Sequence, residues 1–245
     1  MHEPILKEHK NSEKIVIFIH GFMGTPDHFK YFADTVFDSG CSYYTILLPG
    51  HGDTSKTFSK KGINDWTPYV ISEIKKFSEK YKKIYLVGHS MGGLLSLNSS
   101  LLFNNVSCVF ILSSPLKLSL FTPKSFYRKF KLLFLPKNSE IKKTYAKSIS
   151  LSNINFFSFF TWKKPVLGLL KLMKITRSNL NKITIPVIMF YSKNDEITSF
   201  KSSDILYNGL SSKIKDRIIF TKSTHVYYTP EDTKKILNKL IEHIK

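Results

Sequence analysis

The run Gly88-His89-Ser90-Met91-Gly92 is the segment of this chain whose residue types are most suited to chemistry. It follows the apolar residues 83–87 and precedes a segment of helical character, so Ser90 is predicted on a sharp strand-to-helix turn. Such a turn strains the serine backbone and leaves its hydroxyl clear of the chain. Glycines two positions before and after it let the strand and the helix approach each other. The pattern predicts a serine nucleophile.

A serine hydroxyl becomes a good nucleophile only when a base removes its proton. The usual base is a histidine that a carboxylate holds in the right tautomer. Of the eight histidines, only His225 and His243 lie well after Ser90 in the chain. His225 occupies a short predicted loop between a strand and the last helix, whereas His243 lies within that helix. We therefore predict that His225 is the base.

The acid is expected in a loop after a strand, between the serine and the histidine. Residues 191–197 supply such a loop, and Asp195 is the predicted acid. Glu196 is the alternative, because the register within a short loop is hard to derive from sequence. Asp204 is a third candidate, disfavoured because it falls within a predicted helix.

The oxyanion that forms when a serine attacks an acyl carbon requires N–H donors that are already in place. One predicted donor is the backbone N–H of Met91, the residue after the nucleophile. The other is expected from the loop His20-Gly21-Phe22-Met23-Gly24, with the N–H of Phe22 as the preferred group. The catalytic prediction thus comprises Ser90, Asp195 and His225, with Phe22 and Met91 as the oxyanion hole.

His51, in the run Pro49-Gly50-His51-Gly52-Asp53, is expected at the same edge of the fold. His20 and Asp53 could form a metal site with it, but no helical histidine pair or cysteine cluster supports one. We predict a structural, hydrogen-bonding role for His51, and neither a metal nor a cofactor for the protein. The two cysteines lack the spacing of a metal site or redox pair and are predicted to be free thiols.

Strand-like and helix-like segments alternate along the chain, which implies a mostly parallel sheet covered by helices on both faces. The side chains predicted to do chemistry all follow strands, so they should meet at the carboxyl edge of the sheet. Strands are expected over residues 14–19, 43–48, 83–87, 106–112, 186–191 and 217–221. Helices are expected after Thr25-Pro26, from a cap at Asp65 to about residue 80, over 92–104 and 202–210, and from Thr229 to about residue 244.

Between residues 115 and 180 the alternation stops, and we interpret this stretch as a cap inserted into a single domain of residues 1–245. It holds fourteen Lys and Arg against one acid, Glu140, and is rich in aromatics. Phe126, Phe130 and Phe134 recur at helical spacing among basic residues. We expect the apolar face of the cap to line an acyl pocket. A further hypothesis is that its basic face makes weak contact with anionic lipid surfaces.

The chain resembles the α/β-hydrolase fold superfamily and, more narrowly, the bacterial carboxylesterases and monoacylglycerol lipases. The resemblance covers essentially the full length. It rests on His20-Gly21-Phe22-Met23-Gly24-Thr25-Pro26, Gly50-His51-Gly52, Asn64-Asp65-Trp66, the Ser90 turn, Asp195 and His225. It implies a Ser-His-Asp hydrolase of carboxylic esters that needs no cofactor and carries a small cap forming an acyl tunnel. Dehalogenases and epoxide hydrolases of this fold use an aspartate nucleophile, and Ser90 argues against both.

The leading functional hypothesis is a serine esterase acting on monoacylglycerols or other short-to-medium-chain acyl esters. A thioesterase, a lysophospholipase and a serine peptidase remain alternatives, because the same triad serves all of them. From a different class, a ligand-binding member of the fold without turnover is also considered. The net charge of +19 is accompanied by no nucleic-acid-binding motif, so no nucleic-acid partner is expected. The sequence shows no secretory signal or long apolar run, and a cytoplasmic protein is expected.

Overall fold

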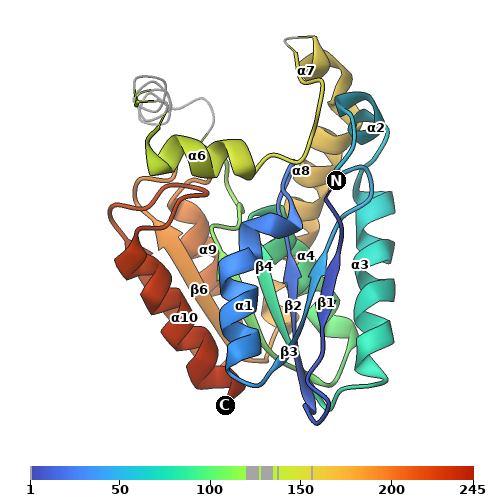
Figure 1. Ribbon diagram of the computed structural model, residues 1–245, viewed down its shortest axis with the longest axis vertical. Helices are drawn as coiled ribbons and strands as arrows, with labels where there is room; N and C mark the ends of the chain where they lie inside the picture. The colour runs from blue at the N-terminus through green and yellow to red at the C-terminus, as the bar shows by residue number, and fades with distance from the viewer. Residues whose placement is uncertain (1, 120–126, 128–134, 137, 156) are drawn as a thin grey trace.

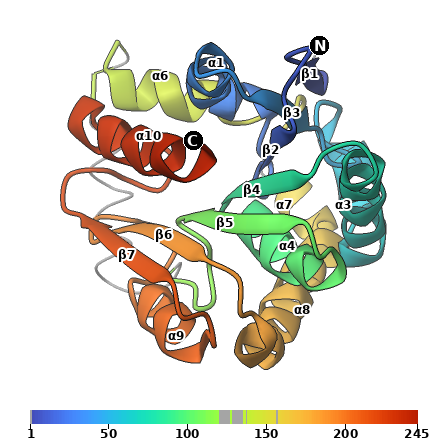
Figure 2. The ribbon, with the colours of Figure 1, turned by 90° about the horizontal axis from the view of Figure 1, so that it is seen from below.

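The computed structural model describes residues 2–119, 127, 135–136, 138–155 and 157–245. Its centre is a sheet with the strand order β1-β3-β2-β4-β5-β6-β7 (Figures 1 and 2). The strand β1 pairs antiparallel with β3, and all other neighbours pair in parallel. The strands are β1 (Ile5–Lys7), β2 (Lys14–Ile19), β3 (Ser42–Ile46), β4 (Lys83–His89), β5 (Val106–Leu112), β6 (Val187–Ser192) and β7 (Lys215–Phe220). The predicted α/β class is confirmed.

Helices cover both faces of this sheet, because successive side chains of a strand point to opposite sides. In β2, Ile15 and Ile17 pack on one face while Val16 and Phe18 pack on the other. The second face is covered by α1 (Lys30–Asp38) and α10 (Pro230–Ile244), and the first by α3 (Ile63–Ser78), α4 (Met91–Ser99), α8 (Lys163–Asn179) and α9 (Lys201–Gly209), as Figure 2 shows.

The predicted strands agree with the observed ones to within two residues at each end. Among the strands and α-helices outside residues 115–180, two short elements were not predicted: the edge strand β1 and the helix α2 (Ser55–Ser59). Each is too short to show a periodic pattern.

Two predicted helix starts need correction. Thr25 does act as an N-cap, but it opens a short 3-10 turn over Pro26–Phe29, and α1 begins only at Lys30. Gly62, not Asp65, is the N-cap of α3; the Asp65 carboxylate lies in the first turn and accepts a 2.9 Å hydrogen bond from the Gly62 N–H. An acid in this position satisfies a terminal N–H group and so stabilises the helix start.

The stretch between β5 and β6 holds α6 (Glu140–Lys147), α7 (Ser158–Thr161) and α8 in its described part. Figure 1 shows α6 lying across the end of the fold above α1 and α10, with α7 above α8. The Trp162 indole anchors this stretch by donating a 3.0 Å hydrogen bond to the Ser55 hydroxyl. The predicted apolar row of Phe126, Phe130 and Phe134 lies outside the described residues. The definition of residues 115–180 as a cap stays a prediction.

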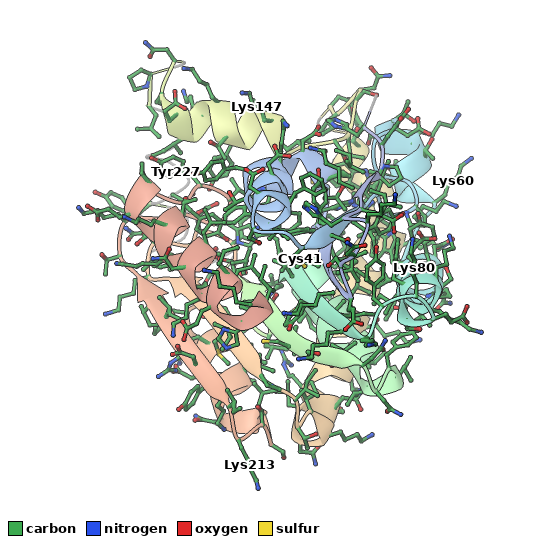
Figure 3. The ribbon with its side chains drawn as sticks, turned by 60° about the horizontal axis from the view of Figure 1, so that its bottom comes forward. Cys41, Lys60, Lys80, Lys147, Lys213 and Tyr227 are labelled. Carbon is green, nitrogen blue, oxygen red and sulfur yellow. The ribbon has the colours of Figure 1, made fainter. Side chains whose placement is uncertain are left out.

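Both cysteines are buried and free, because they lie in separate strands or loops of the core. Positive charge is spread over the surface: Lys60, Lys80, Lys147 and Lys213 are exposed on different elements, and Figure 3 shows them on several sides of the molecule. Among the described residues, no helix is both long and apolar enough to span a membrane.

Candidate active site

Ser90 lies on the turn between β4 and α4, with backbone angles φ 53° and ψ −120°. This conformation is unfavourable for a residue with a side chain, and the surrounding structure holds it in place. The Ser90 N–H donates a 2.8 Å hydrogen bond to the Leu112 carbonyl of β5. A Cβ on Gly92 would lie only 1.9 Å from the Ile19 carbonyl oxygen of β2. Only glycine lets α4 start this close to the sheet.

The structure brings Ser90, His225 and Asp195 into one hydrogen-bonded row. The Nε2 atom of His225 lies 3.1 Å from the Ser90 Oγ, and its Nδ1 lies 2.8 Å from the Asp195 Oδ2. All three residues are buried, with at most 7% of any of them exposed. They come from the ends of β4 and β6 and from the loop after β7, so the parallel topology places them at one edge. In this geometry His225 can accept the Ser90 proton while Asp195 orients the ring.

The loop after β6 distinguishes between the three predicted acids. The Asp195 Oδ1 accepts hydrogen bonds from the backbone N–H groups of Ile197 and Thr198, at 2.8 and 2.7 Å, which aims Oδ2 at the histidine. Glu196 points elsewhere and accepts a 3.2 Å hydrogen bond from the His225 backbone N–H. Asp204 lies on α9 and pairs with Arg217 at the surface. Among these three, the structure places only the Asp195 carboxylate on the imidazole ring.

Charge governs the protonation of His225. Burial alone would lower its pKa, but the neighbouring carboxylates of Asp195 and then Glu196 favour the protonated ring, and its pKa is raised above the ordinary value of 6.5. Two more imidazole rings lie beside it in tilted contact. The ring centroids of His28 and His89 lie 4.4 Å apart, and those of His89 and His225 lie 4.9 Å apart. Burial lowers the pKa of His28 to about 4 and that of His89 well below 6.5, so both rings are neutral near pH 7.

The two predicted oxyanion donors lie at the start of α4 and in the loop after β2. Met91 is the first residue of α4, whose opening N–H groups have no acceptor within the helix. Phe22 follows β2, and its ring packs edge-on against Phe58 with centroids 5.0 Å apart. Gly21, the residue before Phe22, approaches Ser90 so closely that a Cβ added to Gly21 would lie 2.8 Å from the Ser90 Cβ. The loop carrying Phe22 therefore lies against the nucleophile, as the sequence predicts; the donor roles stay predictions.

His20 connects this loop to the segment that follows β3. Its Nε2 accepts a 3.1 Å hydrogen bond from the Leu48 N–H, and its Nδ1 lies 3.0 Å from the Gly21 carbonyl oxygen. An acceptor role for Nε2 requires the proton on Nδ1, so the ring is neutral. The burial of His20 supports a neutral ring, because it lowers the pKa of this histidine to about 4.

His51 contributes ring packing to the same region. Its ring lies edge-on to His20 at 4.7 Å and to Phe58 at 5.0 Å between centroids. Its nitrogens face the Leu48 and Pro49 carbonyls without reaching hydrogen-bond geometry with any described residue. The predicted hydrogen-bonding role of His51 is therefore not observed among the described residues, and its contacts are those of its ring.

An apolar cavity of about 400 Å³ lies directly above Ser90 and His225. Its walls come from the loop after β2, the Ser90 turn, the segment after β5, and α6 and α8. The described lining contains no Lys, Arg, Asp or Glu; it consists of His20, Gly21, Phe22, Met23, Gly24, His28, His89, Ser90, Pro115, Leu118, Tyr145, Ser148, Ile149, Trp162, Val166, Leu169, Leu170, Ile197, His225 and Val226. A cavity of this size holds a small organic molecule.

Residues 16–202 of the chain match the Alpha/beta hydrolase family. The chain belongs to this family. The matched range includes Ser90, Asp195 and the loop that carries Phe22, whereas His225 follows it. The predicted membership and the mostly parallel seven-stranded sheet are both confirmed.

This alpha/beta hydrolase is distantly related to lipases and esterases. It is 25% identical over 248 residues to the thermostable monoacylglycerol lipase of Bacillus sp. (strain H-257), covering 98% of this chain and 93% of the relative. It is 23% identical to a carboxylesterase of Bacillus subtilis (strain 168), covering 89% and 86% of the two chains. The solved monoacylglycerol lipase of Paleococcus ferrophilus superposes with a TM-score of 0.74 at 20% identity, over 99% and 98% of the chains, which shows the shared fold.

Sequence reasoning missed several residues around the hydrolase site. Tyr145 of α6 is hydrogen-bonded to the loop that carries His225, and Ser150 to the loop that carries Phe22. The neutral rings of His28 and His89 lie in tilted contact beside His225. Tyr145 and Ser150 lie in a stretch without a recognisable pattern, so only their position in space reveals them. His89 lies within the serine motif itself, where its identity was visible but its orientation was not.

Proposed function

We propose that this hydrolase is a serine carboxylic-ester hydrolase that acts on monoacylglycerols or other short-to-medium-chain acyl esters. The observation that carries the proposal is the row Ser90–His225–Asp195 at the floor of an apolar cavity. Distant relationship to a monoacylglycerol lipase and a carboxylesterase supports the same class of substrate.

The mechanism follows from the positions of the groups. The Nε2 of His225 takes the Ser90 proton as Oγ attacks the ester carbon, and the imidazolium forms beside the Asp195 carboxylate. The negative oxygen of the tetrahedral intermediate turns toward the N–H groups of Phe22 and Met91. His225 then protonates the departing alcohol, which leaves an acyl-enzyme on Ser90. A water molecule, deprotonated by His225, releases the acid and restores the serine.

The cavity supports an uncharged ester over a charged one. Its described walls hold no ionisable side chain other than histidines and Tyr145. His20 and His28 are neutral because burial lowers their pKa to about 4. A phosphocholine or a coenzyme A group would have to leave its charges without a partner in such a cavity. An acyl chain and a glycerol-sized alcohol fit it better, so an ester is favoured over a lysophospholipid or a thioester of that kind.

The test is hydrolysis of a series of p-nitrophenyl esters and monoacylglycerols by the wild type and by Ser90→Ala. We expect the wild type to be active and the variant to lose activity by at least about a thousandfold. Undiminished hydrolysis by Ser90→Ala would refute the mechanism. If neither protein hydrolyses any ester, the ligand-binding alternative is favoured instead.

We further propose that the rim of the cavity makes weak contact with anionic lipid surfaces. Ile149, Val166 and Leu170 both line the cavity and are exposed. Further exposed apolar side chains are Phe160 of α7 and Leu167 of α8, and Figure 1 shows α7 lying above α8. Exposed lysines accompany these apolar residues on α8, namely Lys163, Lys164, Lys171 and Lys174. Apolar insertion combined with basic charge suits a surface of anionic lipid.

Vesicles with and without anionic lipid test this contact at low and high salt. We expect sedimentation with anionic vesicles at low salt and release as salt screens the charges. Equal binding to neutral vesicles, or no binding to either, would contradict the proposal without affecting the esterase assignment.

A further inference from the structure

The helix α6 is hydrogen-bonded directly to the loops that hold the catalytic histidine. The Tyr145 hydroxyl donates to the Glu196 Oε1 and also lies 3.1 Å from the Thr224 Oγ1. Glu196 follows β6, and Thr224 precedes His225 in the loop after β7. Three segments that are far apart in sequence therefore meet at one phenol group.

Glu196 links Tyr145 to His225. Its second oxygen, Oε2, accepts a 3.2 Å hydrogen bond from the His225 backbone N–H. Two adjacent carboxylates thus hold His225 in different ways, because Asp195 binds its ring and Glu196 binds its main chain. Only 2% of Glu196 is exposed, and burial followed by the charge of Asp195 raises its pKa. A donor such as the Tyr145 hydroxyl favours the ionised form of this buried group.

The same stretch of chain also reaches the loop of the predicted oxyanion hole. The Ser150 N–H donates a 2.9 Å hydrogen bond to the Met23 carbonyl, and Met23 has the left-handed φ of 61°. The residue after Phe22 is therefore held, in an unfavourable conformation, by the segment that follows α6. The loops that hold His225 and the loop that carries Phe22 are thus both hydrogen-bonded to residues 140–151.

We propose that Tyr145 is a positioning residue that acts through Glu196, so that the geometry of His225 depends on α6 being seated. This inference rests on the proposed esterase function. Without the phenol hydroxyl, Glu196 has one donor fewer in a buried position, and its hold on the His225 N–H weakens. The helix α6 would then be required for the chemical step, and not only for lining the cavity that binds the acyl group.

The variants Tyr145→Phe and Glu196→Gln test the inference, with Tyr44→Phe as a matched control. Tyr44 donates a 2.7 Å hydrogen bond to Glu73, which is also buried, but this pair joins β3 to α3 away from the site. We expect Tyr145→Phe to lower kcat by about tenfold. The loss should be the same for p-nitrophenyl acetate and for longer esters, with KM for acetate unchanged. Tyr44→Phe should retain kcat within about twofold, whatever its effect on Tm.

The pH profile separates positioning from a merely structural role. The groups around His225 are Asp195 and Glu196 from the loop after β6, His89 at the end of β4, His28 in the 3-10 turn before α1, and, through Glu196, Tyr145 from α6. The negative charge of Glu196 helps to raise the pKa of His225. Glu196→Gln removes that charge, and Tyr145→Phe removes a donor that favours the ionised form of Glu196. Glu196→Gln and Tyr145→Phe should therefore both move the acid limb of kcat/KM to lower pH, whereas Tyr44→Phe should leave it in place.

NMR titration of the His225 ring supplies a readout that does not depend on turnover. Inactive wild-type protein would refute the esterase function, and the titration would still decide whether Tyr145→Phe lowers the pKa of His225. The inference is overturned if Tyr145→Phe keeps kcat within twofold and leaves the titration of His225 unchanged. It is also overturned if Tyr44→Phe loses as much kcat as Tyr145→Phe does.

Discussion

Replacement of Asp195 by asparagine is the sharpest test of how the site holds its histidine. The Asp195 Oδ1 accepts two backbone N–H groups, those of Ile197 and Thr198. An asparagine must keep its oxygen at that position, because an NH₂ group cannot accept from these donors. Its NH₂ group is then directed at the His225 Nδ1, where Oδ2 stood at 2.8 Å. The variant keeps the shape of the site while exchanging an acceptor for a donor.

This exchange forces the wrong tautomer on the base. With Nδ1 accepting, the proton of neutral His225 moves to Nε2, which faces the Ser90 Oγ at 3.1 Å and can no longer take a proton from it. In a serine protease the same substitution lowers kcat by about 10⁴-fold, and we expect a loss of that order here. This corresponds to about 5.4 kcal/mol of transition-state stabilisation.

The assay is steady-state hydrolysis of p-nitrophenyl butyrate by the wild type, Asp195→Asn and Glu196→Gln, with Tm measured for each. Glu196 binds the main chain of His225 and leaves the tautomer alone, so its variant should lose far less activity. The reasoning fails if Asp195→Asn stays within tenfold of the wild type while Glu196→Gln loses thousands-fold. That result would make Glu196 the acid.

Three further predictions follow from the site and its surroundings. Because protonated His225 cannot accept the Ser90 proton and its pKa is raised above 6.5, kcat/KM should fall about tenfold per pH unit on the acid side of a midpoint above 6.5; a midpoint below 6 would contradict this. Gly92→Ala places a Cβ 1.9 Å from the Ile19 carbonyl oxygen, a clash expected to cost about 3 kcal/mol and lower Tm by roughly 6 to 12 °C. Gly40→Ala meets no atom within 4 Å and adds only the strain of φ +88°, so it should cost about 1 kcal/mol; equal Tm losses would disprove the close approach. Leu169→Trp should narrow the cavity of about 400 Å³, lowering kcat/KM for dodecanoyl esters by tenfold or more while sparing acetate; an unchanged chain-length profile would place the acyl group elsewhere.

Much of the fold was predictable because its strands are buried on both faces. In β2 the residues Ile15 to Ile19 are all apolar and buried, and the exact agreement at Val106–Leu112 has the same cause. The edge strand β1 was missed because it is three residues long and half exposed, so burial leaves no pattern in it. The start of α3 was shifted because Asp65 stabilises the first turn from inside the helix, a role that resembles capping in sequence.

The site, like the fold, was predictable from the sequence only in part. The chain order of Ser90, Asp195 and His225 is visible in the sequence, because each residue follows a strand and parallel strands end at one edge. The choice between Asp195 and Glu196 was open, since adjacent loop residues differ only in where the backbone points them. In the structure the N–H groups of Ile197 and Thr198 hold the Asp195 carboxylate so that its other oxygen meets the imidazole.

By itself, the sequence determined the class of fold and predicted Ser90 and His225 as a catalytic pair, with the acid still open between adjacent loop residues, because strand burial, glycine spacing and chain order are local properties. Tertiary structure alone decided which carboxylate meets the imidazole, how large and how apolar the cavity is, and that α6 touches the histidine loop through Tyr145. Those features depend on contacts between segments far apart in the chain. Pair contacts of that kind leave no periodic trace in a single sequence, since each partner looks like an ordinary loop or helix residue.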